Sequence, residues 1–445
     1  MSEIPCLLEG DPVFQKADEV WLMGVWKNSP SSQRIARSIP FLRPEFQLAS
    51  EDLKEIDIYG SPYSIYEYVL DDLLGEQEDL ILSKQRLNAL GKKLILDFVP
   101  NHMSIDSLWI ERDPNLFLEA NESTEPQNQF NHSNGRSYCH GRDPYFNGWT
   151  DTIQWDFSNP KVETIHIEIL SAIAKVADGV RCDMAMLLLP DVFKKTHGKD
   201  SKYSWSRVIK TIKSSFPNFK FYAEVYWNRE KDLLDLGFDA TYNKNLYDSM
   251  VENQFLSIYD QMKNIGANQT SIPNEIRFLE NHDEKRAKAT FSSKTPIYFS
   301  ILCFSEAVHL FHYGQSFGFS KKIPVQMISV DEDKIDTELF EFYKRTFHIL
   351  NNRIGMVFIQ KLSYTEFNSK ELLALQIKSD SQKEIFIFNP NSCEVSGFLY
   401  LDEVIESEEI HEIIEDKRYK QDPLIRKKSQ LYFKLYTGSA QWIVI

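Results

Sequence analysis

The sequence lacks the long apolar run that a membrane-spanning helix requires. None of its 445 residues fall in a stretch of the roughly 20 consecutive apolar residues that a bilayer demands. The segment after Met1 also lacks the basic start and the apolar core of a signal peptide. We therefore expect a cytoplasmic protein that has no membrane partner.

The sequence has few cysteines, and it has fewer positively than negatively charged residues. The five cysteines are scattered, odd in number and without CxxC spacing, which is typical of a reducing compartment rather than of a disulfide framework or a zinc site. The 50 Lys and Arg residues face 65 Asp and Glu residues, so the formal net charge is −15. Because nucleic-acid phosphates require a basic surface, this balance argues against a nucleic-acid partner.

Two motif classes that often accompany a cofactor are also missing. No GxGxxG or GKS/T turn is present to cradle a phosphate, which disfavours a nucleotide-binding doubly wound sheet. Asn101 and His102 with nearby carboxylates could suggest a metal site, but no HExxH motif or tight histidine cluster supports catalytic metal. We therefore predict no resident cofactor and assign no metal ligand.

What the sequence does contain is an alternation of apolar strands and amphipathic helices up to about residue 351. A strand over 19–26, a helix over 78–90 and a strand over 94–99 have the spacing of a βαβ unit. Beyond Gly355 the pattern changes to short runs that alternate with period two. This order predicts an α/β protein with a (β/α)8 TIM barrel followed by an all-β domain.

The barrel pattern is interrupted once. Residues 103–152 are rich in Asn, Asp, Ser, Gly and aromatic residues, show no convincing regular element, and are too many for an ordinary connection. We interpret them as an inserted, loop-rich subdomain that follows the third barrel strand. The predicted domains are a catalytic barrel at 1–102 and 153–353, the inserted subdomain B at 103–152, and a C-terminal β-sandwich at 354–445.

The start of the barrel is short. If 19–26 is the second barrel strand, the 18 residues before it hardly hold a strand, a helix of about 11 residues and two connections. A barrel without its first strand would leave an unpaired edge. We hypothesise that the first strand is missing or shortened, through a misassigned start or a real truncation. An in-frame stop directly upstream of Met1, with no alternative start, would contradict a misassigned start.

Polar residues end four of the expected strands. Arg181 and Asp183 are two residues apart at the end of 179–183, so their side chains leave the same face of the strand. The other three ends are listed here: Asn101-His102, Glu224, and Asn281-His282-Asp283. Because a barrel gathers the C-terminal ends of its strands on one face, we expect these residues to form one site.

Three carboxylates stand at these ends: Asp183, Glu224 and Asp283. Two carboxyl groups about 5 Å apart support retaining glycoside cleavage, one as nucleophile and one as general acid/base. We interpret Asp183 as the nucleophile, held ionised by Arg181. The apolar neighbours of Glu224 favour the uncharged form that an acid role requires. Each carboxylate taken singly would more often be an ordinary surface residue, whereas their joint placement favours a site.

Two histidines accompany them, His102 and His282, both in Asn-His pairs at strand ends. Neutral imidazole can donate a hydrogen bond to a sugar hydroxyl. A lone histidine would more often be a satisfied structural residue, but the repeated pairing favours a role in substrate binding.

These motifs resemble the four ordered signature regions of the α-amylase family, glycoside hydrolase family 13. Asp97–His102, Gly179–Asp183, Ala223–Val225 and Asn281–Asp283 occur in the order of that family, and the matching segments span about residues 19 to 326. The resemblance implies a (β/α)8 barrel, an inserted domain after the third strand and a C-terminal β domain. It also implies site roles: Asp183 as nucleophile, Glu224 as acid/base, Asp283 as transition-state stabiliser, and Tyr63, His102, Arg181 and His282 as substrate-binding residues.

The sequence departs from the family at several points. After Asp183 it reads Met184 to Leu187, where many starch-degrading members carry a lysine and a histidine, so we expect different acceptor-side subsites. Ser64 stands where an aspartate usually follows the stacking tyrosine, and 154–156 fall where a fifth, looser signature is expected. Calcium, which family members often hold through the inserted domain, is not supported by this sequence.

The leading hypothesis is a retaining enzyme that hydrolyses or transfers α-glucosidic units, with an oligosaccharide or α-glucan as substrate. An alternative keeps the same machinery but passes the glycosyl unit to phosphate or another sugar, as sucrose- or maltose-acting relatives do. A third is a catalytically idle, glycan-binding family member, against which the complete set of three carboxylates argues. No motif indicates substrate length, linkage or oligomeric state.

Overall fold

The computed structural model describes residues 8–264, 274–305, 307–366, 371–402, 409–420 and 429–445. These residues form two compact units. The first contains Ala17–Tyr242 and Lys322–Glu332, together with the start of the chain, and the second contains Asp11–Lys16, Asn243–Lys321 and Asp333–Ile445. Each unit is described by itself.

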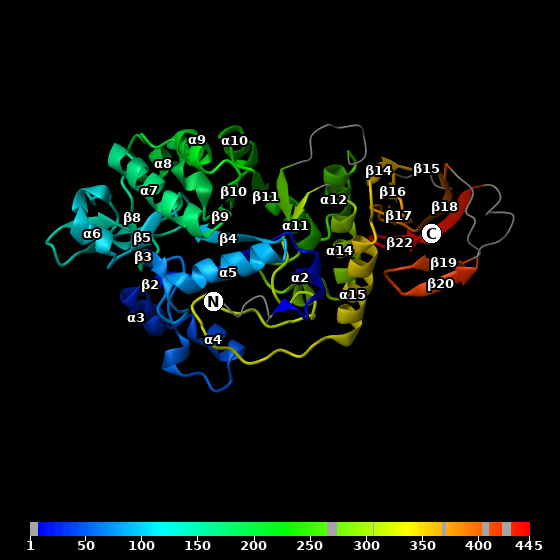
Figure 1. The fold of residues 1–445 in the computed structure, drawn as a ribbon, viewed down its shortest axis with the longest axis horizontal. Coiled ribbons are helices and arrows are strands. Elements are labelled where there is room, and N and C mark those ends of the chain that lie inside the picture. The colour runs from blue at the N-terminus through cyan, green and yellow to red at the C-terminus, as the bar shows by residue number, and fades with distance from the viewer. Residues whose placement is uncertain (1–7, 265–273, 306, 367–370, 403–408, 421–428) are drawn as a thin grey trace. The chain divides into compact units, whose positions relative to one another are not determined.

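The central sheet consists of parallel strands in the order β1-β4-β9-β10-β11-β12-β13. Figure 1 labels β4, β9, β10 and β11 of this sheet. Five of its strands belong to the first unit: β1 (Glu19–Leu22), β4 (Lys93–Phe98), β9 (Gly179–Cys182), β10 (Lys220–Ala223) and β11 (Ala240–Tyr242). Two belong to the second: β12 (Glu275–Arg277) and β13 (Val308–His309). This curled, half-barrel sheet confirms the predicted α/β architecture. The sheet has seven strands among the described residues, and the hypothesis of a missing or shortened first strand falls in part on residues 1–7, outside the described ranges.

Parallel pairing aligns the ends of the strands in the first unit. β4 pairs with β9 so that Asp97 lies opposite Arg181, and β9 pairs with β10 so that Cys182 lies opposite Ala223. Gly179 permits this close pairing, because a Cβ atom there would lie only 2.8 Å from the carbonyl oxygen of Lys220. The residues that follow β4, β9 and β10 therefore emerge at the same edge of the sheet.

Amphipathic helices connect these strands. α5 (Gln77–Ala89) precedes β4, and α7 (Pro160–Val176) precedes β9. α7 begins where Asn159 accepts a hydrogen bond from the Lys161 N–H and Pro160 occupies the first turn, both of which favour a helix start. Four further helices of this unit are α3 (Pro30–Ser38), α4 (Arg43–Ala49), α8 (Pro190–His197) and α9 (Trp205–Ser215). A short helix, α10 (Glu230–Asp235), precedes β11.

The segment over 103–152 contains more regular structure than its sequence pattern indicated. β5 (His102–Ser104) pairs antiparallel with β8 (Thr152–Gln154), and β6 (Gln129–Asn131) pairs antiparallel with β7 (Ser137–Cys139). A one-turn helix, α6 (Leu108–Arg112), follows β5. Three-residue strands are too short to establish an alternating pattern, so the sequence did not predict them.

Two further strands pair beside the same region. β2 (Trp26–Asn28) and β3 (Ile65–Leu70) form an antiparallel pair with an irregular register. The described ranges include no helix that is both long enough and apolar enough to cross a membrane.

The second unit combines helices with an all-β C-terminal part. Its helices are α2 (Pro12–Lys16), α11 (Lys244–Val251), α12 (Phe255–Met262), α13 (Ala287–Phe291), α14 (Thr295–Cys303) and α15 (Thr337–Asn351). One C-terminal sheet contains β14 (Phe358–Lys361), β16 (Leu373–Lys378), β17 (Lys383–Phe388), β22 (Ala440–Val444), β19 (Glu409–Glu412) and β20 (Lys417–Lys420). The other contains β15 (Ser363–Glu366), β18 (Val395–Tyr400) and β21 (Gln430–Leu435).

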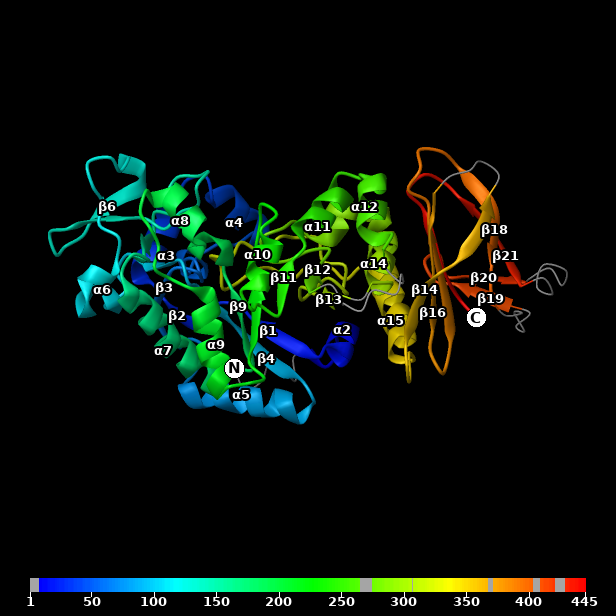
Figure 2. The ribbon, with the colours of Figure 1, turned by 90° about the horizontal axis from the view of Figure 1, so that it is seen from above.

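The two C-terminal sheets pack face to face (Figure 2). Their shared core includes Ile387 from the first sheet and Leu399 and Phe433 from the second, all buried. Alternate residues of β21 point to solvent, as the period-two pattern predicted. The all-β character expected for this part of the chain is confirmed.

Candidate active site

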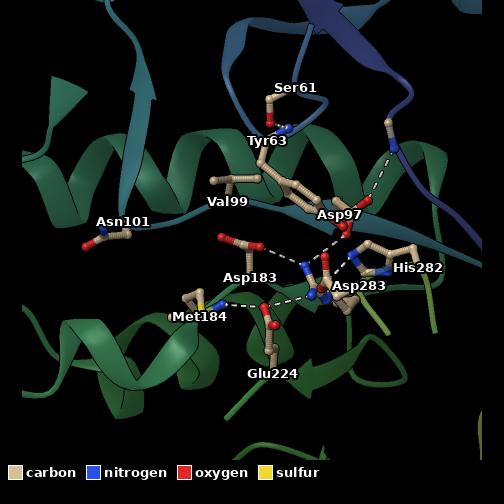
Figure 3. A network of polar contacts seen from close by, with 12 residues as sticks. Ser61, Tyr63, Asp97, Val99, Asn101, Asp183, Met184, Glu224, His282 and Asp283 are labelled. Carbon is tan, nitrogen blue, oxygen red and sulfur yellow. Dashed lines mark hydrogen bonds and ion pairs between the residues drawn. The ribbon is translucent and has the colours of Figure 1, made fainter. Parts of the chain in front are cut away.

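Arg181 is the centre of a buried charged cluster at the strand ends of the first unit. Its carboxylate partners Asp97, Asp183 and Glu224 are labelled in Figure 3. Nη1 of Arg181 lies 2.9 Å from Oδ1 of Asp183, and its Nη2 lies 2.7 Å from Oε2 of Glu224. Nη1 is also 3.6 Å from Oδ1 of Asp97. Side-chain exposure is 2% for Arg181, 9% for Asp183 and 4% for Glu224. One buried cation is therefore shared among three buried carboxylates.

This charge imbalance affects protonation. Burial raises the pKa of Asp183 well above its ordinary value, and the negative charge of Glu224 raises it further, while Arg181 opposes both effects. Because the two carboxyl groups interact strongly, a retained proton belongs to the pair rather than to either residue. Acid-assisted nucleophilic chemistry uses such a pair, with one carboxyl group protonated and the other ionised.

Glu224 is held by two donors besides Arg181. The backbone N–H of Met184 donates to Oε2 at 2.9 Å, and the hydroxyl of Tyr226 donates to Oε1 at 2.6 Å. Met184 has a φ of 43°, a left-handed conformation that costs a residue with a side chain about 1–3 kcal/mol. The backbone of Met184, directly after Asp183, is therefore strained in the conformation in which its N–H donates to Glu224.

Tyr226 was not predicted from the sequence. It lies two residues after Glu224, and residues two apart on extended backbone share a face, so that spacing was the signal that could have identified it.

Three aromatic rings surround the guanidinium group of Arg181. Its Cζ lies 5.2 Å from the ring centroid of Trp21, 5.3 Å from that of Tyr63 and 5.8 Å from that of Tyr242. Aromatic faces attract a cation and exclude water from it. Tyr63, which was predicted as a substrate-stacking residue, is thus brought against Arg181. Trp21 and Tyr242 were not identified, because they come from β1 and β11, far from Arg181 in the sequence.

His102 lies at the start of β5 and is buried. Burial lowers its pKa to about 4, although a hydrogen bond with the backbone of Tyr63 opposes this effect. The imidazole is therefore neutral in neutral solution. Its Nδ1 lies 3.4 Å from Nδ2 of Asn101, and its ring centroid lies 5.1 Å from that of Trp149. The inserted segment thus packs directly on His102.

His282 and Asp283 belong to the second unit, in the loop after β12. Nε2 of His282 lies 2.9 Å from Oδ2 of Asp283, whose side chain is 46% exposed. The carboxamide oxygen of Asn281 accepts hydrogen bonds from the backbone N–H groups of Asp283 and Glu284, at 2.9 and 3.0 Å. This turn fixes the course of the chain at the predicted site residues.

A buried ion pair supports the same loop. Glu280 is fully buried, with Oε1 2.7 Å from Nη1 of Arg286 and Oε2 accepting from the N–H of Ala287 at 2.5 Å. Arg286 also donates to the carbonyl oxygen of Tyr313 at 2.8 Å. The loop that carries Asp283 is therefore anchored on both sides.

Sequence comparison identifies two curated relatives, although no family model matches the chain. "Alpha-amylase 2" of Dictyoglomus thermophilum is 25% identical over 370 residues, which cover 74% of this chain and 60% of that protein. A cyclomaltodextrin glucanotransferase of Bacillus sp. (strain 1-1) is 24% identical over 263 residues, covering 53% and 35%. These comparisons support the resemblance of the chain to the α-amylase family. The chain spans 60% or less of the length of these two relatives.

Solved structures of α-amylase-family proteins share the fold. A maltogenic α-amylase, AmyB, from Thermotoga neapolitana superposes with a TM-score of 0.66 at 18% identity, covering 100% of this chain and 94% of that one. An α-amylase from H. orenii gives a TM-score of 0.64 at 18% identity, covering 98% and 92%. A cyclomaltodextrinase gives 0.66 at 14% identity, covering 99% and 70%.

Members of this family often hold calcium through the inserted domain. Among the residues that the structure describes, no group of three or more His, Cys, Asp or Glu side chains could hold a metal ion.

Proposed function

We propose that the protein is a retaining α-glycoside hydrolase or transglycosidase that acts on the α-glucosidic bonds of oligosaccharides or α-glucans. The observation that carries this proposal is the buried cluster in which Arg181 contacts both Asp183 and Glu224. The curated relatives support it, since one is an α-amylase and the other a cyclomaltodextrin glucanotransferase.

The mechanism is a double displacement. A carboxylate oxygen of Asp183 bonds to the anomeric carbon as the glycosidic C–O bond breaks, and Glu224 gives its proton to the departing oxygen. In the second step, Glu224 takes a proton from water or from an acceptor hydroxyl, whose oxygen attacks the anomeric carbon and releases Asp183.

Arg181 suits both steps because it contacts both carboxylates. In the free enzyme it offsets the charge of Asp183. When Asp183 becomes an ester, Glu224 has lost its proton, and Nη2 of Arg181 faces this new carboxylate at 2.7 Å. Arg181 therefore faces one negative charge in both states: on Asp183 in the free enzyme and on Glu224 in the glycosyl-enzyme.

The remaining predicted residues would act on the sugar itself. Asp283 stabilises the positive charge that develops at the anomeric carbon, and His102 and His282 hydrogen-bond sugar hydroxyls at the cleavage subsite. Tyr63 presents an aromatic ring, which suits stacking on a sugar face. Ala185, Met186 and Leu187 follow Met184 and carry no charged or hydroxyl group for an acceptor sugar, which suits acceptor-side subsites unlike those with a lysine and a histidine.

Product analysis tests the proposal. The purified protein is incubated with maltooligosaccharides, sucrose, trehalose and glycogen, with and without phosphate, and products are resolved by size and anomeric form. Shorter or transferred glucans released first as the α anomer support a retaining enzyme. Sugar phosphates would support the phosphorolytic alternative. Saturable binding without turnover of any substrate would support the idle, glycan-binding alternative.

We also propose a cytoplasmic location. The cysteines among the described residues, Cys139, Cys182, Cys303 and Cys393, are free, which suits a reducing compartment. Cell fractionation that recovers the protein with secreted or envelope fractions would contradict this.

A further inference from the structure

Gln154 is fully buried at the end of β8, where the inserted segment returns to the strand end that carries Asn101. Its Nε2 lies 2.9 Å from the carbonyl oxygen of Asn101, 3.1 Å from Oδ1 of Asn101 and 3.1 Å from the carbonyl oxygen of Trp155. A single amide NH2 group therefore faces three oxygen atoms that belong to two segments of the chain.

Oxygen atoms that converge from carbonyl and carboxamide groups are the ligands that Ca²⁺ prefers, at 2.3–2.6 Å. In this chain the same oxygens are engaged by N–H donors. The carbonyl oxygen of Asn101 accepts from the N–H of Trp155 at 3.3 Å as well as from Gln154, so both of its lone pairs are used. A cation could bind these oxygens only by displacing Gln154. These three oxygen atoms are therefore not available as ligands to a metal ion.

The nearest carboxylate along the chain is compensated by the protein as well. Oδ2 of Asp156 lies 2.6 Å from Nζ of Lys199. Its Oδ1 accepts from both the N–H and the hydroxyl of Ser158, at 3.0 and 2.7 Å. The negative charge two residues after Gln154 thus has an ammonium partner, and both of its oxygens are occupied.

We propose that the side chain of Gln154 takes the place of a metal ion as the cross-link between the inserted segment and the end of β4, with Lys199 neutralising Asp156. The cross-link reaches the candidate active site. β5 and β8 pair His102 with Gln154, and Nδ2 of Asn101 lies 3.4 Å from Nδ1 of His102. Gln154 therefore contacts Asn101, which in turn lies against His102. This inference stands on the contacts of Gln154 and does not depend on the proposed function.

The first test uses the unaltered protein. Its Tm is measured after dialysis against EDTA and again after CaCl2 is added in excess. A metal ion that binds only the folded state raises Tm by mass action, so a structural calcium ion would be worth about 5 °C or more. We expect Tm to differ by less than about 1 °C between the two conditions. A loss in EDTA that CaCl2 restores, or stoichiometric calcium in the dialysed protein by elemental analysis, would overturn the proposal.

The second test removes the cross-link. Gln154→Leu keeps the size of the side chain but deletes the N–H donors, which leaves buried oxygens without a partner. We expect its Tm to fall by about 5 °C or more, equally in EDTA and in CaCl2. Gln85→Leu, the same change at an exposed position of α5, is the matched control and should leave Tm unchanged. A Gln154→Leu protein as stable as the unaltered one would overturn the role of this side chain, and the first test remains decisive if the variant does not fold.

Discussion

Nη2 of Arg181 lies 2.7 Å from Oε2 of Glu224, so the last residues of β9 and the first residue after β10 are joined by a buried ion pair. The same guanidinium group contacts Asp183 through its other terminal nitrogen. A change in the charge of either carboxylate therefore changes the electrostatic environment of the other. The predictions below use this coupling and the groups that surround it.

Replacing Asp183 by Asn should abolish turnover. The amide keeps the shape of the carboxylate but cannot form the glycosyl ester, and loss of a nucleophile costs about 10³-fold or more in kcat. The measurement is initial rate on the best oligosaccharide of the substrate panel, with circular dichroism to verify folding. Asp200→Asn, an exposed aspartate on the same unit, is the matched control. A folded Asp183→Asn protein with full activity would end the assignment of Asp183 as nucleophile.

The same variant should be more stable than the parent at neutral pH. The pKa of Asp183 is raised by burial, so the folded state binds its proton more tightly than the unfolded state does. The folded state of the parent therefore loses stability as pH rises from the ordinary carboxyl pKa of 3.8 through the raised pKa of Asp183. The Asn variant has no proton to lose at this position, so its stability does not fall for this reason. Thermal unfolding of both proteins at about pH 4 and about pH 7 measures the effect. An advantage of Asn that does not grow with pH would show that burial does not raise the pKa of Asp183.

Tyr226→Phe should reduce kcat without unfolding the protein. The substitution deletes one hydroxyl, and with it the 2.6 Å hydrogen bond to Oε1 of Glu224. A hydrogen bond to a charged acceptor is worth about 1.5–3 kcal/mol, which corresponds to a loss of roughly 10- to 100-fold if the bond supports the transition state. The measurement is kcat and KM on the best oligosaccharide of the substrate panel, with circular dichroism to verify folding. An unchanged kcat would mean that Tyr226 only packs beside Glu224.

Glu280→Gln should weaken the second unit and lower activity. Glu280 and Arg286 form a fully buried pair, and removing one charge from such a pair destabilises a protein by about 3–5 kcal/mol. The loop that carries His282 and Asp283 follows directly, so we expect kcat to fall more than KM rises. Urea unfolding with parallel kinetics measures both. Glu284→Gln, in the same loop but only partly buried, should change stability much less.

Acid should destabilise the protein below about pH 6.5, the ordinary histidine value. Burial lowers the pKa of His166 to about 3, so this imidazole stays neutral when folded but gains a proton when unfolded. Its contribution to stability is complete above 6.5 and is lost as pH falls toward its folded pKa. His166→Phe should therefore gain stability relative to the parent as pH falls, whatever the offset from the lost contact with the Tyr203 hydroxyl. Parallel stability curves between pH 7 and about pH 4 would contradict this.

Much of the candidate site could be read from the sequence because each motif sits at the end of a short apolar strand. Asp183 follows β9 and Glu224 follows β10, and parallel strands that share a sheet present their ends at one edge. Periodicity within about ten residues is enough to identify such a strand. The alternation of elements, the all-β C-terminal part and the Arg181–Asp183 pairing were therefore accessible without a structure.

Contacts between distant segments needed the tertiary structure. Trp21 and Tyr242 surround Arg181 only because β1 and β11 lie in the same sheet as β9, and no local pattern encodes which aromatic ring reaches a given strand. Gln154 likewise meets Asn101 through the register of β5 and β8, two strands too short to leave a periodic signal.

The sequence by itself determined the order of the elements and which polar residues end the strands, because both follow from the chemistry of neighbouring residues. Only the tertiary structure decided how those residues share charge. Burial raises the pKa of Asp183. Short distances between segments allow Arg181 to contact two carboxylates and Gln154 to link the inserted segment to Asn101. Electrostatic interactions depend on the distance between charges and on the exclusion of water, and neither can be derived from the order of the residues alone.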